Sequence, residues 1–240
     1  MRAELHGDWH VHSTFSDDAR STLDEIVAAA HAAGVRELRC TEHVRHDTTW
    51  VPDFLAAVAA LSVPPGLVVR TGVEAKLLDV TGALDVPLDL VVGPGGVDAV
   101  VVADHQVPTP EGPWSPRRTQ EAMAAGLTAD AVVGWVVEAT IGAMRRLPGR
   151  AQLAHPFSIL PKVGVDEAAI PDALLRRWAV EAAETGTLVE VNEKWACPRP
   201  RAVRAARDAG ARVVASTDAH VAADVGRYDA VARILDEADR

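Results

Sequence analysis

The sequence predicts an α/β fold in which a parallel sheet closes into a barrel, as a single domain over residues 1–240. Short β-branched runs alternate with Ala-rich amphipathic segments along the chain, and repeated βα units imply parallel strands with helical crossovers. No linker or low-complexity tract divides the 240 residues, a length common for such barrels. Polar residues follow nearly every predicted strand, which favours a barrel over an open sheet.

The alternating segments define the individual elements. Strands are predicted at residues 8–11, 37–41, 68–74, 98–103, 151–154, 187–191 and 212–216. Helices are predicted near residues 22–33, 52–61, 130–146, 172–184, 199–209 and 228–238. Gly34, Gly186 and Gly210 each follow a helical pattern and precede a strand, as glycines at helix ends do. Thr22 and Glu25 have the spacing of a capping box at the first helix.

The composition limits the possible partners. The formal net charge of −10 opposes stable binding of long nucleic acids, because that binding neutralises phosphates with cations. A small phosphorylated substrate stays possible, since bound metal ions invert the local field. The two cysteines, Cys40 and Cys197, form no Cys-x-x-Cys motif and imply no disulfide framework.

The hydropathy pattern predicts no membrane segment. The first residues lack the apolar core of a secretory signal. The most apolar long stretch, residues 131–144, is interrupted by Glu138 and is too short to span a bilayer. We therefore expect a soluble, cytoplasmic protein, and the sequence indicates no oligomeric state.

Imidazole and carboxylate side chains recur just beyond the predicted strands. Six of the nine histidines and two acids occupy such places: His10, His12, His43, Glu74, His105, His155, Asp218 and His220. These groups are the ligands that hold Zn, Mn and Fe in proteins. Residues i and i+2 of a strand point the same way, so each His-x-His or Asp-x-His pair can reach one centre. If the barrel closes, its first and last strands are neighbours and these pairs meet.

These motifs resemble those of the PHP (polymerase and histidinol phosphatase) family of metal-dependent phosphoesterases. The first motif reads Asp8-Trp9-His10-Val11-His12-Ser13, and the second reads Thr41-Glu42-His43, with glutamate where aspartate is usual. The other ligand positions follow in the family's order up to His220. The resemblance implies a distorted (β/α)7, TIM-like barrel that holds two or three divalent metal ions, Zn, Mn or Fe.

The resemblance also implies which residues bind each metal. One ion would be held by His10, His12, Glu74 and Asp218, and a second by Glu74, His105 and His155. A third would use His43, His220 and one acid of Ser16-Asp17-Asp18, with Asp18 preferred and Asp17 the alternative.

Several further residues receive predicted roles. Glu190 and Asn192 are expected to form a hydrogen-bond network around the ligands. Asp104 is expected to be exposed to solvent, and orientation of a ligand histidine is the alternative. Lys194 and Arg45 are the predicted phosphate contacts. Arg199 and Arg201 are the alternatives for that contact.

The predicted reaction is hydrolysis of a small phosphomonoester by attack of a metal-bound hydroxide, as in histidinol phosphatases. Glu74 and Asp218 would hold the metals at which the reaction occurs, and Lys194 and Arg45 would stabilise the phosphoryl charge. A nucleotide or oligonucleotide phosphatase or phosphodiesterase of the same family is the first alternative, and a non-catalytic metal-binding module is the second. Specificity would lie in loops such as residues 107–120 and 194–201.

Overall fold

Seven parallel strands form the centre of the fold in a computed structural model, which describes residues 2–240. In spatial order they are β1 (Gly7–Val11), β2 (Glu37–His43), β3 (Val68–Lys76), β4 (Ala99–Ala103), β7 (Ala151–Ala154), β8 (Leu188–Asn192) and β9 (Val213–Ser216). This order follows the chain, as expected when each crossover has the same hand. The predicted parallel α/β architecture is therefore confirmed.

The first and last strands meet and nearly close the barrel. The backbone N–H of Asp218 donates to the carbonyl of His10 over 2.9 Å, and the N–H of His12 donates to the carbonyl of Ala219 over 2.9 Å. Val11 and Ala219 form an isolated parallel bridge at the same place. This closure brings the His-x-His and Asp-x-His motifs together, as the sequence predicts.

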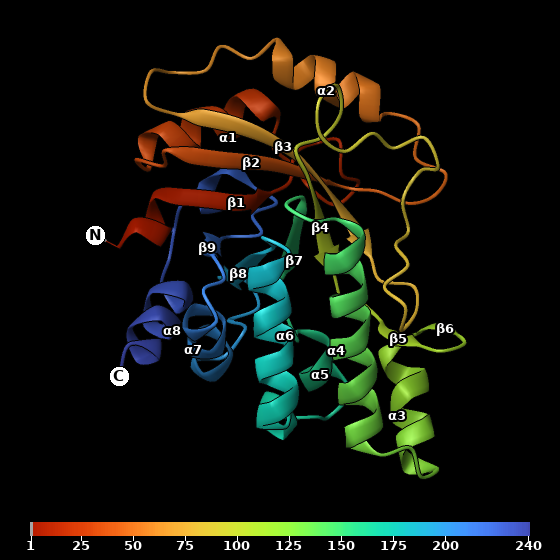
Figure 1. The fold of residues 1–240 in the computed structure, drawn as a ribbon. Coiled ribbons are helices and arrows are strands. Elements are labelled where there is room, and N and C mark those ends of the chain that lie inside the picture. Colours follow the sequence, from red (N-terminus) through yellow and green to blue (C-terminus); the bar gives the residue numbers. More distant parts are fainter. Residues whose placement is uncertain (1) are drawn as a thin grey trace.

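Helices surround the sheet on its outer side (Figure 1). They are α1 (Leu23–Ala32), α2 (Val51–Ala59), α3 (Pro116–Ala124), α4 (Ala129–Arg146), α5 (Ile159–Lys162), α6 (Asp172–Glu184), α7 (Pro200–Asp208) and α8 (Ala230–Ala238). Short 3₁₀ turns lie at Ala3–His6, Glu167–Ala169 and Ala222–Asp224. The capping box of α1 is present, since Thr22 and Glu25 exchange hydrogen bonds between side chain and backbone. Within residues 2–240, no helix is long and apolar enough to cross a membrane.

The strands separate an apolar outer face from a polar interior. Leu38 and Cys40 of β2 are fully buried in an apolar cluster with residues of α1 and α2. Because side chains alternate along a strand, Arg39 and His43 turn to the opposite face, inside the barrel. The barrel-facing side of β2 thus carries the cation Arg39 near the beginning of the strand and the imidazole of His43 at its end.

Residues 107–120, expected from the sequence to form a loop, contain regular structure. They fold as a hairpin of β5 (Val107–Thr109) and β6 (Gly112–Trp114), followed by the start of α3. Gly112 makes the turn possible with a φ of +113°, and the Ser115 side chain accepts a hydrogen bond from the Arg118 N–H to begin α3. Three-residue strands are too short for the alternation that predicts strands from sequence.

Two glycines of α4 test how tightly this helix packs. A Cβ at Gly142 would lie 2.3 Å from the carbonyl oxygen of Thr81, whereas a Cβ at Gly134 would meet no atom within 4 Å. We expect Gly142→Ala to lower the free energy of unfolding by about 1–3 kcal/mol through overpacking. The control Gly134→Ala should raise it by about 0.5–1 kcal/mol through helix propensity. Urea titration measures both, and equal effects at the two positions would contradict this packing.

Candidate metal centre

A single buried carboxylate lies at the centre of the predicted ligands. Strand β3 carries Glu74, whose side chain is 1% exposed. Its oxygens face five imidazoles: Oε1 lies 3.1 Å from His105 Nε2 and 3.2 Å from His155 Nε2, and Oε2 lies 2.9 Å from His43 Nδ1, 3.4 Å from His10 Nε2 and 3.5 Å from His12 Nε2. Despite these neighbours, Oε2 has no hydrogen-bond partner among the described residues. A buried carboxylate oxygen without a donor needs another source of positive charge.

The orientation of His10 is set by Glu190. The Nδ1 atom of His10 lies 3.1 Å from Glu190 Oε2, so the ring proton belongs on Nδ1 and the lone pair on Nε2. That lone pair points at Nε2 of His12, only 2.9 Å away. Two ring nitrogens at this separation repel unless a proton or a cation lies between them.

The orientation of His12 is set by a serine. Ser16 Oγ donates to Glu42 Oε2 over 2.7 Å, so it accepts from His12 Nδ1, 3.3 Å away. The His12 lone pair therefore lies on Nε2, which faces the neighbouring ring of His10. Such outer partners fix the tautomer of a metal-binding histidine.

The orientation of His155, on the other side of Glu74, is also set by a serine. Ser158 Oγ donates to Asp104 Oδ1 over 2.8 Å and accepts from His155 Nδ1, 3.0 Å away. The His155 Nε2 atom therefore faces Glu74 Oε1, 3.2 Å away. His10, His12 and His155 thus turn their Nε2 atoms toward one small volume, from the end of β1 and from the segment after β7.

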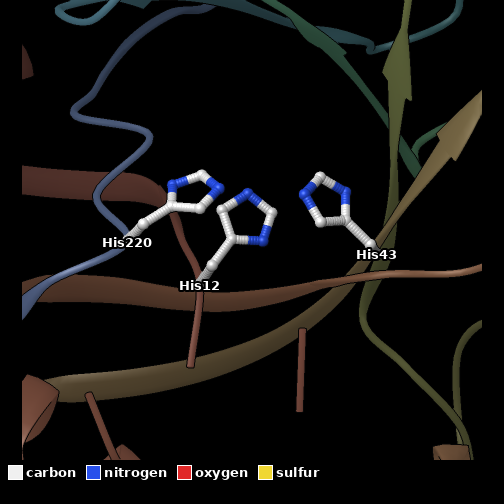
Figure 2. A group of neighbouring side chains, drawn as sticks. All are labelled: His12, His43 and His220. Atoms are coloured by element: carbon white, nitrogen blue, oxygen red, sulfur yellow. The ribbon is translucent and has the colours of Figure 1, made fainter. Parts of the chain in front are cut away.

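The interior holds three groups of side chains whose ligand atoms lie within 4.8 Å of one another. The groups are His10, His12 and Asp218; Glu74, His105 and His155; and His12, His43 and His220. Figure 2 shows the third group, with the rings of His12, His43 and His220 turned toward one another. The first two groups correspond to the two predicted ligand sets, and the third contains both predicted histidines together with His12.

Asp18 lies beside the third group. Its Oδ2 is 3.2 Å from His220 Nε2, and its Oδ1 is 3.5 Å from His43 Nε2. Asp17 is exposed and makes no ion pair in the described part of the chain. The geometry thus favours Asp18 over Asp17, although the ligand role of either stays a prediction.

The predicted phosphate contacts differ in their distance from the centre. Lys194 Nζ lies 3.5 Å from Asp218 Oδ1 and 3.3 Å from His220 Nδ1, at the rim. Arg45 is exposed, and its guanidinium has no ion-pair partner among residues 2–240. Of these two cations, Lys194 is the one in contact with the ligand groups.

The other two candidate phosphate contacts, Arg199 and Arg201, form ion pairs with carboxylates that are not metal ligands. Arg199 pairs with Asp166 over 3.2 Å, and Arg201 pairs with Asp172 over 2.8 Å. The first contact joins the start of α7 to the segment between α5 and α6, and the second joins it to the first residue of α6. These arginines therefore hold the fold together beside the site.

The expected exposure of Asp104 is wrong. It is 2% exposed and accepts the hydrogen bond from Ser158 that orients His155. It follows directly after β4, and its partners His155 and Ser158 come from the segment after β7, which the local sequence does not reveal. The predicted network around Glu190 is confirmed, because Glu190 also accepts from Gln152 Nε2 over 2.7 Å and from Asn192 Nδ2 over 2.6 Å.

Two contributors to the site were not predicted. Glu42 accepts hydrogen bonds from the Ser13 N–H and hydroxyl and from Ser16, which ties the first loop to β2. Trp195 donates its indole N–H to Asp218 Oδ2 over 2.9 Å. The glutamate in the Thr-Glu-His motif was the one available signal, since its extra methylene extends its reach.

Burial and mutual charge shift the pKa values of the cluster strongly. Burial would raise the pKa of Glu74, but the surrounding imidazoles, His10 first, hold it well below its usual range. Burial would lower the pKa of His155, yet Asp104 and Glu74 raise it to about 10. Burial lowers the pKa of His12 to about 3, although the nearby carboxylate of Asp218 opposes this shift. The metal-free cluster thus balances its carboxylates with protons on some of its imidazoles.

A parallel barrel with imidazole and carboxylate groups converging at the strand ends defines the class of metal-dependent barrel hydrolases. The chain belongs to the PHP domain family, whose profile matches residues 8–133. The family predicted from the sequence motifs is therefore confirmed.

Curated relatives extend the likeness along nearly the whole chain. A "Probable phosphatase" of Acetivibrio thermocellus is 25% identical, with 97% of this chain and 86% of the relative aligned. The "Probable phosphatase YcdX" of Escherichia coli O1:K1 is also 25% identical, over 97% of this chain and 85% of the relative. These names agree with the predicted class of phosphoric ester hydrolase.

A solved structure has the same fold. The histidinol phosphate phosphatase of Lactococcus lactis, crystallised with zinc, L-histidinol and phosphate, superposes with a TM-score of 0.68. The two chains are 15% identical, and the match covers 97% of this chain and 92% of that one. The TIM-like PHP barrel predicted from the sequence is thereby confirmed.

Replacing the central carboxylate tests whether it organises a metal site. We expect Glu74→Gln to weaken divalent metal binding by roughly tenfold or more, since it removes the negative charge shared by the imidazoles. The control Glu121→Gln lies on the exposed surface of α3 and should leave metal content unchanged. Elemental analysis after gel filtration measures both, and full metal content in Glu74→Gln would contradict this role.

Metal binding should release protons. In the metal-free chain the pKa of His155 is about 10, so the ring is protonated near neutral pH, and a divalent ion requires its unprotonated form. Affinity should therefore rise as the pH increases toward 10. Calorimetry in buffers of different ionisation enthalpy counts the released protons. Asp104→Asn, which lowers the pKa of His155, should reduce that count, and an unchanged count would contradict this assignment.

Proposed function

We propose that the chain is a metal-dependent phosphatase that hydrolyses a small phosphomonoester with the help of two or three divalent ions, Zn, Mn or Fe. The observation that carries the proposal is the convergence of five imidazoles on the buried carboxylate of Glu74. The donor set of nitrogen and carboxylate oxygen suits these metals. The unpartnered Oε2 of Glu74 and the facing nitrogens of His10 and His12 both fit ions between them.

The ligand assignment divides the donors into three sets. One ion would be held by His10, His12, Glu74 and Asp218, and a second by Glu74, His105 and His155. The third would be held by His43, His220 and Asp18, and His12 lies close to this third group. Bound divalent ions would activate water, neutralise the phosphoryl charge and orient the ester.

The protein itself supplies the positioning. Glu190, Ser16 and Ser158 hold the ring protons of the ligand histidines away from the centre. The Trp195 indole N–H fixes Asp218, which has a left-handed φ of 55°. Donors that do not reorganise during the reaction are the main way in which a protein stabilises a transition state.

Lys194 is the proposed phosphate contact of the chain. Its ammonium group lies at the rim beside Asp218 and His220, and its side chain is 44% exposed, so it can reach an incoming phosphoryl oxygen. Arg45, exposed after β2, is the second candidate for this contact.

Charge favours a small substrate over a long polyanion. The chain carries a net charge of −10, which disfavours extended phosphate backbones. The Lactococcus lactis structure holds L-histidinol and phosphate, so histidinol phosphate is the first compound to test.

The proposal is tested by phosphate release from histidinol phosphate, nucleoside monophosphates, other small phosphomonoesters and short oligonucleotides, with metal-loaded and chelator-treated protein. We expect metal-dependent turnover of a phosphomonoester. Absence of release from every compound, with bound metal verified, would contradict a phosphatase. Release from oligonucleotides alone would instead support the alternative function, an oligonucleotide phosphatase or phosphodiesterase.

Substitution of Lys194 tests the phosphate contact. Lys194→Ala should raise KM or lower kcat/KM by roughly tenfold or more, because a charge-assisted hydrogen bond is lost. Metal content should stay unchanged, and Lys194→Arg should restore part of the activity. Arg117→Ala on the exposed surface of α3 is the control, and wild-type kinetics for Lys194→Ala would refute the contact.

A further inference from the structure

A second polar cavity opens at the end of the barrel opposite the metal centre. It has a volume of about 410 Å³ and is lined by the beginnings of the strands. Four arginines line it: Arg39, Arg70, Arg150 and Arg212. The metal ligands lie at the other ends of these strands, so the cavity is separate from the site described above.

The arginines are arranged around one indole. The guanidinium carbons of Arg39, Arg70 and Arg212 lie 4.9, 5.7 and 4.7 Å from the centre of the Trp9 ring. Trp9 is 4% exposed and therefore fixed in the wall. Cation–π contacts of this kind hold mutually repelling guanidinium groups in place.

Two of these guanidinium groups have a buried N–H that donates no hydrogen bond to the described residues. Arg39 is 4% exposed, and its Nε atom has no hydrogen-bond partner in the described part of the chain. The buried Nε of Arg70 also lacks a partner there. A buried donor on a charged group costs free energy unless a ligand or water satisfies it.

The surrounding carboxylates do not balance the cluster. Glu37 pairs with Arg70 over 3.2 Å and with Arg212 over 3.3 Å. Asp98, the acid in the cavity wall, accepts hydrogen bonds from Thr71 with Oδ2. Four guanidinium groups thus face two carboxylates, in a chain whose net charge is −10.

Deeper in the barrel, the nearest acid, Glu190, is engaged by other donors. Glu190 contacts His10 and accepts from Gln152 and Asn192. Burial lowers the pKa of Arg39 to about 10, and the positive charge of Arg70 adds to this shift. Positive charge therefore exceeds negative charge at this mouth of the barrel.

We propose that this cavity binds a small phosphate-bearing anion at a site distinct from the metal centre. Guanidinium groups match phosphate oxygens in pairs, and several of them together suit a dianion. The edge of the cavity is open, because the exposed Gly149 and Gly210 would meet no atom within 4 Å even if a Cβ were present. Alanines and glycines make up most of the remaining wall, so the guanidinium groups are the main polar contacts.

A purely structural role for the arginines makes a different prediction. Arg39 donates to Gln152 Oε1 and so supports the interior network. Arg150 and Arg212 are exposed and make no contact with Gln152. Their replacement should thus affect anion binding without disturbing that network.

Calorimetric titration of inorganic phosphate into the metal-loaded protein tests the proposal. Arg150→Gln/Arg212→Gln should lose one phosphate per chain relative to the wild type, or bind it at least tenfold more weakly. Arg117→Gln/Arg177→Gln changes the net charge equally at exposed positions and should match the wild type. Any phosphate at the metal centre is common to all three proteins, so failure of the phosphatase proposal leaves this comparison intact.

Circular dichroism and thermal unfolding first establish that both double variants are folded. If the cavity variant binds phosphate like its control, the site does not exist. Acetate at equal ionic strength should bind the wild type at least tenfold more weakly than phosphate does, and equal affinity for the monoanion would overturn the assignment to phosphate.

Discussion

The structure depends on the burial of Glu74 among five imidazoles. A carboxylate at 1% exposure cannot remain ionised in an apolar interior without opposite charge nearby. Protons on the imidazoles supply that charge in the metal-free chain, and divalent ions supply it when bound. The interior of the barrel is therefore polar near this end, and the apolar core lies between the outer faces of the strands and the helices.

Three of the five imidazoles near Glu74 have their own orienting partners. His10 is held by Glu190, His12 by Ser16 and His155 by Ser158, and these partners come from different strands and loops. The arrangement works only if the barrel closes, because Asp218 reaches His12 across the junction of β1 and β9. Closure of the fold and assembly of the site are thus one event.

The fold and the ligand groups could be predicted from the sequence because both rest on short-range patterns. Alternation of β-branched and Ala-rich segments located the strands, and i, i+2 spacing placed His10 beside His12. Partners from distant segments could not be predicted: the burial of Asp104 depends on the segment after β7, and the contact of Trp195 with Asp218 depends on the turn after β8. The β5–β6 hairpin was missed because its strands are only three residues long.

The arginine cavity was missed for a related reason. The four arginines are far apart in the sequence and look like separate surface charges until the parallel register brings their strand ends together. Arg39 lies inside the barrel because Leu38 and Cys40 occupy the outer face of β2. Position along the strand then separates the two sites: Arg39 lies near the beginning of β2 and His43 at its end.

Anomalous diffraction from a crystal of the protein loaded with manganese tests the central claim most directly. We expect two or three anomalous peaks around Glu74, each within bonding distance of the imidazole and carboxylate atoms assigned to it. A protein with verified metal content and no peak near Glu74, or with its peaks elsewhere, would contradict the claim that this carboxylate organises the metal centre.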